Sequence, residues 1–159
     1  MKSALIALMS AAAVTISASP VWADDRAVVE NFYKEILGKA ASAGLGERAT
    51  AVLAPAWESL GDYSGVAKKR DQFVAQVEGF GKLIPDLKWS IEDVLQQGNR
   101  YVVRGRATGT PSGPFFGAPH TGKRFDIMSI DIHTVENGKI VRSYHVEDWG
   151  TALRQLKAN

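Results

Sequence analysis

The sequence predicts an α+β domain in which helices precede a curved antiparallel sheet. Up to Pro85, apolar residues recur with a helical period of about 3.6 residues. Beyond Pro85 they alternate with a period of two, as in half-buried strands. Residues 136–139, Glu-Asn-Gly-Lys, separate two such stretches and are typical of a β-hairpin turn. Because the helices come first and the strands follow one another, we expect the helices to cover one face of a curved sheet.

Residues 1–23 have the features of a cleaved export signal. Lys2 supplies a positive charge, residues 4–18 are apolar or small, and Ala23 lies at the spacing of a cleavage site. We therefore expect a periplasmic or secreted location and one domain over residues 24–159. The alternative is an N-terminal membrane anchor, for which the apolar stretch is short. No stable membrane insertion is expected after cleavage.

Three helices are predicted in the first half of the chain, over residues 25–42, 47–53 and 68–83. The apolar positions of the first are spaced i, i+3, i+4 and i+7, and they are Val29, Phe32, Tyr33 and Ile36. Pro55 ends the second helix. Residues 57–65 contain glycine, serine and aromatic residues, and we interpret them as a loop.

Four strands and a closing helix are predicted after Pro85. The strands cover residues 88–97, 100–110, 125–135 and 140–147. A loop rich in glycine and proline, residues 111–122, separates the second strand from the third, and residues 149–157 form a short helix.

The composition limits the chemistry that this domain can perform. None of its 159 residues is cysteine, which excludes disulfides, a thiol nucleophile and cysteine-based metal sites. Lys and Arg number 19 against 17 Asp and Glu, so we expect no nucleic-acid partner. The fold must therefore depend on a hydrophobic core, and the chemistry on His, Asp, Glu, Arg, Tyr or Ser.

The hairpin over residues 125–147 carries the candidate catalytic residues. Alternation places several polar side chains on one side of its strands: Ser129, Asp131, His133, Ser143 and His145. A carboxylate beside an imidazole forms a general acid–base pair. We expect His145 to be the general acid/base and Asp131 to orient it, while Ser129 or Ser143 donates a hydrogen bond to an oxyanion. The alternative is an ordinary ion pair on a solvated face.

Two registers of this hairpin are open. A two-residue turn at residues 137–138 pairs Asp131 with Tyr144. A three-residue loop with a bulged glycine pairs Asp131 with Ser143 and makes it a diagonal neighbour of His145. The second register gathers the polar side chains on one face.

Other candidates are less specific. The spacing of His133, His145 and Asp131 or Glu147 permits a metal site without indicating one, so we expect no metal and no cofactor. His133 or Arg104 could assist catalysis, although a strand arginine is more often solvated or paired. We expect large aromatic residues to line a pocket for a small apolar molecule, or else to pack in the core: Trp57, Tyr63, Phe80 and Trp149.

Three segments together resemble the SnoaL-like polyketide cyclases, also called ester cyclases, of the nuclear-transport-factor-2-like superfamily. They are residues 113–125, Gly-Pro-Phe-Phe-Gly-Ala-Pro-His-Thr-Gly-Lys-Arg-Phe, the turn at 136–140, and residues 145–149, His-Val-Glu-Asp-Trp. The likeness covers about residues 26–156.

The resemblance implies a cone of curved antiparallel sheet wrapped around three N-terminal helices with a central pocket. It also implies a homodimer through the outer sheet face and cofactor-free ring closure by intramolecular aldol condensation. The family's catalytic Asp on the last strand matches His145 here, while a pocket His and a pocket Gln match Asp131 and Ser129. The acid–base pair of the family is therefore exchanged in this chain.

From these observations we expect an exported, cofactor-free acid–base enzyme that cyclises or isomerises a small apolar carbonyl compound. One alternative is a non-catalytic periplasmic module that binds a small ligand. Another is a dehydratase or an epoxide hydrolase, which Arg104 within hydrogen-bonding reach of Asp131 would favour.

Overall fold

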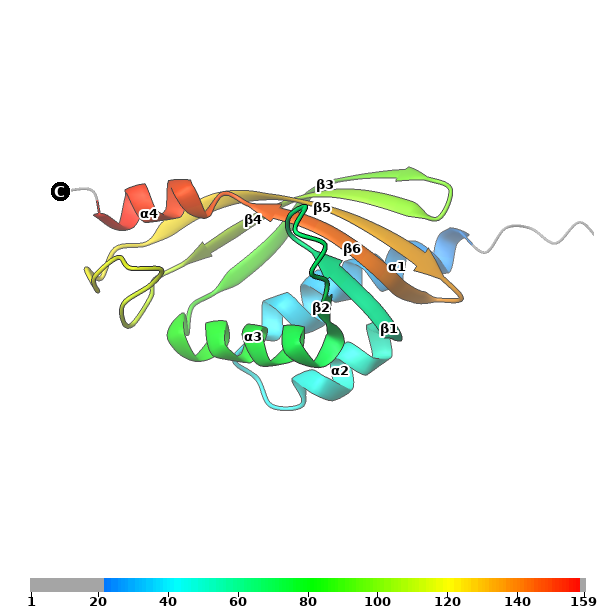
Figure 1. The fold of residues 1–159 in the computed structure, drawn as a ribbon, viewed down its shortest axis with the longest axis horizontal. Coiled ribbons are helices and arrows are strands. Elements are labelled where there is room, and N and C mark those ends of the chain that lie inside the picture. Colours follow the sequence, from blue (N-terminus) through cyan, green and yellow to red (C-terminus); the bar gives the residue numbers. More distant parts are fainter. Residues whose placement is uncertain (1–21, 158–159) are drawn as a thin grey trace, which may run out of the picture.

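The computed structural model describes residues 22–157, in which helices pack against the concave face of a curved sheet (Figure 1). The predicted export signal lies outside this part of the chain except for its last two residues. The first helix begins at Trp22, just before the predicted cleavage point. None of the helices in residues 22–157 is long and apolar enough to cross a membrane.

The helical half follows the predicted order. The first predicted helix consists of α1 (Trp22–Asn31), a π-helical turn (Phe32–Ile36) and a 3-10 turn (Leu37–Lys39). Next come α2 (Leu45–Val52) and, after two strands, α3 (Arg70–Leu83). The four apolar residues predicted to face inward from the first helix are buried, at most 3% exposed. A π-helical turn departs from the regular helical repeat and is frequent near functional sites.

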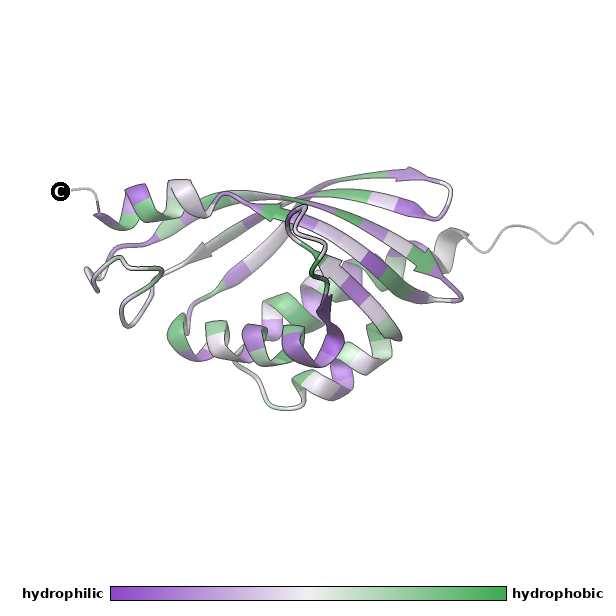
Figure 2. Cartoon of the chain, in the orientation of Figure 1, coloured by the Kyte–Doolittle hydropathy of each residue, from purple (hydrophilic) through white to green (hydrophobic). Residues whose placement is uncertain are grey.

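Within residues 22–157 the strands form one six-stranded sheet with the order β2-β1-β6-β5-β4-β3. Its strands are β1 (Leu53–Leu60), β2 (Lys68–Lys69), β3 (Lys88–Gln97), β4 (Arg100–Gly109), β5 (Phe125–Glu136) and β6 (Lys139–Glu147). Helix α4 (Trp149–Lys157) follows at one end of the sheet (Figure 1). Hydrophobic and hydrophilic residues alternate along the long strands, so one face packs on the helices (Figure 2).

The loop predicted over residues 57–65 is wrong in its first part. Strand β1 continues to Leu60, and the loop begins only after it. Strand β1 also makes the sheet mixed, since it runs parallel to β6 while the other pairs are antiparallel. Pro55 is accommodated where the β1–β6 register shifts, between Leu53 and Glu58. A proline cannot donate a ladder hydrogen bond, and an irregular stretch of this kind tolerates it.

The hairpin adopts neither of the two predicted registers. Asn137 and Gly138 both have positive φ, 51° and 69°, and form a two-residue turn between Glu136 and Lys139. The extra residue lies inside β6, at Val141, where the pairing shifts. The bulge therefore lies within the strand instead of the turn, and it brings Asp131 directly opposite His145.

Candidate functional site

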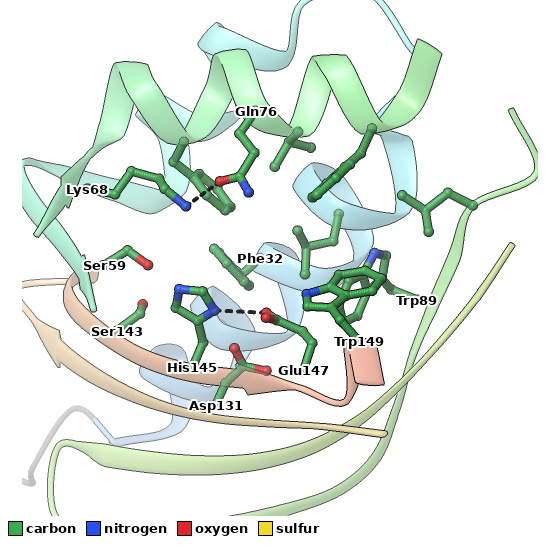
Figure 3. A pocket seen from close by; sticks show the side chains of 15 residues that line it. Phe32, Ser59, Lys68, Gln76, Trp89, Asp131, Ser143, His145, Glu147 and Trp149 are labelled. Carbon is green, nitrogen blue, oxygen red and sulfur yellow. Dashed lines mark hydrogen bonds and ion pairs between the residues drawn. The ribbon is translucent and has the colours of Figure 1, made fainter. Parts of the chain in front are cut away.

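A pocket lies between the concave face of the sheet and helix α3 (Figure 3). Aromatic rings form much of its apolar wall: Phe32, Phe73, Phe80, Trp89 and Trp149. The polar groups come mainly from the strands: Ser59, Lys68, Asp131, Ser143, His145 and Glu147. Gln76 of α3 completes the polar rim. An apolar cleft with a few convergent polar groups is typical of a small-molecule site.

Three titratable residues lie together in this pocket. Asp131 of β5 lies opposite His145 of β6, and Glu147 follows on the same face of β6. His145 Nδ1 and Glu147 Oε1 are 2.9 Å apart, and Figure 3 shows the Asp131 carboxylate beside this pair. The imidazole is thus oriented by a hydrogen bond that Glu147 accepts, which corrects the predicted role of Asp131. Gly61 leaves room for the ring, since a Cβ there would lie 3.2 Å from Nε2.

The environment raises the pKa values of both Asp131 and His145. Burial raises the pKa of the Asp131 carboxyl to about 7, and the charge of Glu147 adds to this. Hydrogen bonds from Tyr33 and Ser129 act in the opposite direction. The hydrogen bond with Glu147 raises the pKa of His145 above its usual value, against the effect of its own burial. A group whose pKa lies near 7 can both accept and release a proton at neutral pH.

A buried hydrogen-bond network supports Asp131 from behind the pocket wall. Trp57 Nε1 donates to Ser143 Oγ at 3.1 Å, and Ser143 Oγ lies 2.8 Å from His133 Nδ1. His133 Nε2 lies 3.0 Å from the Tyr33 hydroxyl, which also hydrogen bonds to Asp131. Burial lowers the pKa of His133 to about 3, so its imidazole is neutral. His133 therefore packs behind the pocket, and its predicted assistance could only be indirect.

Five of the other predicted site residues either line the pocket or are buried behind it. Phe80 and Trp149 line the pocket, as does Ser143, whereas Trp57 is buried behind it. Ser129 is also buried, and its Oγ donates to Asp131 Oδ2 at 3.3 Å.

The structure contradicts the prediction that Tyr63 and Arg104 belong to the site. Tyr63 is fully exposed, because it lies in the loop beyond the end of β1. Arg104 is exposed on the outer face of the sheet, because its neighbour Val103 is the β4 residue that points inward opposite Asp131. This position removes the observation that would have favoured a dehydratase or an epoxide hydrolase.

Sequence reasoning missed residues that line the pocket, among them Glu147 and Lys68, and one that supports Asp131 from behind it, Tyr33. Glu147 lies two residues after His145 on the same strand, so alternation places both on one face and could have found the part of Glu147 in the site. In the sequence, Tyr33 belongs to the apolar face of a helix and is therefore expected in the core. Lys68 is the first residue of the predicted third helix, where a lysine is expected to point into solvent. Among residues 22–157, no cluster of three or more His, Asp or Glu side chains is arranged to hold a metal ion.

The profile of the SnoaL-like polyketide cyclases matches residues 27–156. No curated protein sequence matches the chain. Several solved structures have the same fold, although their sequences are only 20–25% identical to this chain.

A protein from Jannaschia sp. CCS1, assigned as a SnoaL-like polyketide cyclase, is 23% identical with a TM-score of 0.75, over 91% of this chain and 99% of that one. IdmH from Streptomyces antibioticus, assigned as a polyketide cyclase, is 25% identical with a TM-score of 0.71, over 83% and 97%. AclR from Streptomyces galilaeus, assigned as a hydroxylase, is 20% identical with a TM-score of 0.69, over 84% and 96%. The profile match covers most of the chain, and the chain therefore belongs to the SnoaL-like polyketide cyclase family.

Proposed function

We propose that this protein is a cofactor-free acid–base enzyme that cyclises or isomerises a small apolar carbonyl compound. The observation that carries the proposal is the buried Asp131 carboxyl, whose pKa is raised to about 7 beside the His145–Glu147 pair. Titratable groups with such shifted pKa values in an apolar cleft are typical of active sites. Because the chain begins with a predicted export signal, we propose that the reaction takes place in the periplasm or outside the cell.

In the proposed reaction, the Asp131 carboxylate accepts a proton from the carbon next to a carbonyl group. The resulting enolate either attacks a second carbonyl, which closes a ring, or is reprotonated at another carbon. In ring closure, the His145 imidazolium donates a proton to the new alkoxide, and Glu147 holds the imidazole ring for this transfer. One proton leaves carbon and one reaches oxygen, so no redox partner is consumed.

Exchange of carbon-bound protons for deuterium tests this step without knowledge of the physiological substrate. Wild-type protein in D₂O should speed the exchange next to the carbonyl in a panel of cyclic ketones and 1,3-diketones, followed by NMR. The rate should rise with pH through about 7, because the base must be the Asp131 carboxylate. If panel members bind and none exchanges faster than in buffer, the non-catalytic ligand-binding module becomes the better interpretation.

We also propose that the protein forms a homodimer through the convex face of the sheet. Four large apolar side chains of β5 and β6 are 39–64% exposed there: Met128, Ile130, Tyr144 and Val146. Ile130 and Val146 are cross-strand partners, so they form one continuous apolar surface.

Val146→Glu should convert this dimer to a monomer, because it places a charge in the centre of the apolar surface. The mass in solution, from light scattering after gel filtration, measures the change. Val66→Glu is the matched control, since Val66 is an exposed apolar residue in the loop after β1, away from the convex face of the sheet. A wild-type monomer, or an unchanged mass for Val146→Glu, would contradict the proposal.

A further inference from the structure

One end of the pocket mouth carries hydrogen-bond donors that the proposed reaction does not use. Lys68 of β2 is the cross-strand partner of Ser59 of β1, and both line the pocket. The Lys68 ammonium donates to the Gln76 side-chain carbonyl of α3. Figure 3 shows these three side chains across the pocket from Asp131, with His145 between the two groups.

The charge of Lys68 has no carboxylate partner among the described residues. The adjacent Lys69 forms an ion pair with Glu58 at 2.6 Å, whereas the neutral amide of Gln76 is the hydrogen-bond partner found for Lys68. The Lys68 side chain is half-buried, and its charge opposes the protonation of His145. A partly desolvated ammonium with a neutral partner is stabilised when an anion binds to it.

The donor pattern at this end fits a carboxylate. The Gln76 side-chain carbonyl already accepts from Lys68, so its amide nitrogen remains free to donate. The Ser59 hydroxyl, on the pocket wall, can donate as well, and Lys68 keeps further N–H groups. Charge-assisted hydrogen bonds to both oxygens of a carboxylate would use all three donors.

Resting on the proposed function, we propose that Lys68, Gln76 and Ser59 bind a carboxylate of the substrate. The preferred substrates are then carbonyl compounds with a carboxylate at one end and an apolar body. With the carboxylate on Lys68, the body extends past His145 toward the aromatic wall that includes Trp89 and Trp149. The bound anion also offsets the charge of Lys68, which favours the protonated state of His145 that the reaction needs.

A matched pair of unreactive probes tests this assignment by binding alone. 4-Phenylbutanoate and 4-phenylbutanamide have nearly the same shape, and isothermal titration calorimetry measures the affinity of each. Wild-type protein should bind the carboxylate at least about tenfold more tightly, as expected for hydrogen bonds to a charged group. Lys68→Met should reduce this preference to within about twofold and leave the affinity for the amide unchanged. Lys69→Met is the control and should keep the preference.

Five results would overturn the assignment. They are equal affinity of wild-type protein for both probes, binding of neither probe at millimolar concentration, an undiminished carboxylate preference in Lys68→Met, loss of both affinities in Lys68→Met, and loss of the preference in Lys69→Met. Because no turnover is measured, failure here leaves the acid–base proposal standing. Conversely, a preference for the carboxylate without any deuterium exchange would uphold the carboxylate site and contradict the proposed reaction.

Discussion

Asp131→Asn should lower the rate of proton exchange and of any turnover by roughly 10²–10⁴-fold, the contribution expected of a general base. Asparagine has the shape of the carboxylic acid and can keep hydrogen bonds with Ser129 and Tyr33, so the pocket should remain folded. It cannot accept the proton, and the chemical step should therefore suffer while probe binding changes little.

The matched control is Asp126→Asn on the same strand. Asp126 lies on the outer face of β5, where it forms an ion pair with Arg106. This variant should keep the wild-type rate. An Asp131→Asn variant that is folded and exchanges protons within threefold of wild type would assign the base to another residue, and Glu147 would be the next to test.

The periodicity of the sequence was sufficient to predict the α+β class, the order of the helices and four of the strands. Each of those elements has an apolar face that repeats within its own segment. Strand β1 could not be predicted in this way, because its partner β6 lies far along the chain and Pro55 interrupts its local pattern. Local signals carry little information about a parallel pairing between distant segments.

The candidate site was predictable to the extent that it lies on one hairpin. Alternation along β5 and β6 placed Asp131 and His145 on one face, although the bulge at Val141 that aligns them had no signal in the turn. Tyr33 and Lys68 reach the site from other elements, and only the packed chain brings them there. Sequence reasoning therefore found the polar residues of one supersecondary unit and two aromatic residues of the pocket wall, and it missed the polar residues that reach the site from other elements.

Asp131→Asn should also make the protein more stable than wild type at alkaline pH. The carboxyl has a pKa of about 7 when folded and about 3.9 when unfolded. The contribution of Asp131 to the free energy of unfolding is complete below the pKa of the unfolded chain. It is lost as the pH rises through the pKa of the folded chain, and the loss is about 4 kcal/mol. Asparagine carries no charge and avoids this loss.

The neutral His133 has the opposite dependence, because burial lowers its pKa to about 3. Its contribution is present above the unfolded pKa of about 6.5 and is lost as the pH falls. Between about pH 4 and 6.5, the folded chain holds an extra proton on Asp131 and the unfolded chain holds one on His133. In wild-type protein, the contributions of Asp131 and His133 to the pH dependence of the unfolding free energy cancel. In Asp131→Asn only the contribution of His133 remains, so the variant should lose stability as the pH falls.

Urea unfolding between pH 4 and 8 measures this effect as a difference in the free energy of unfolding between the variant and wild type. The advantage of Asp131→Asn should grow by about 1.4 kcal/mol per pH unit from pH 4 to 7, while groups common to both proteins cancel. Asp126→Asn should show no such growth over this range, since Arg106 lowers the pKa of Asp126 and its carboxyl is ionised in both the folded and the unfolded chain above about pH 4. Parallel curves for Asp131→Asn and wild type would mean that Asp131 titrates as an ordinary carboxyl. If the curves diverge as expected, the carboxylate that makes Asp131 a base at neutral pH is also a charge that destabilises the folded protein.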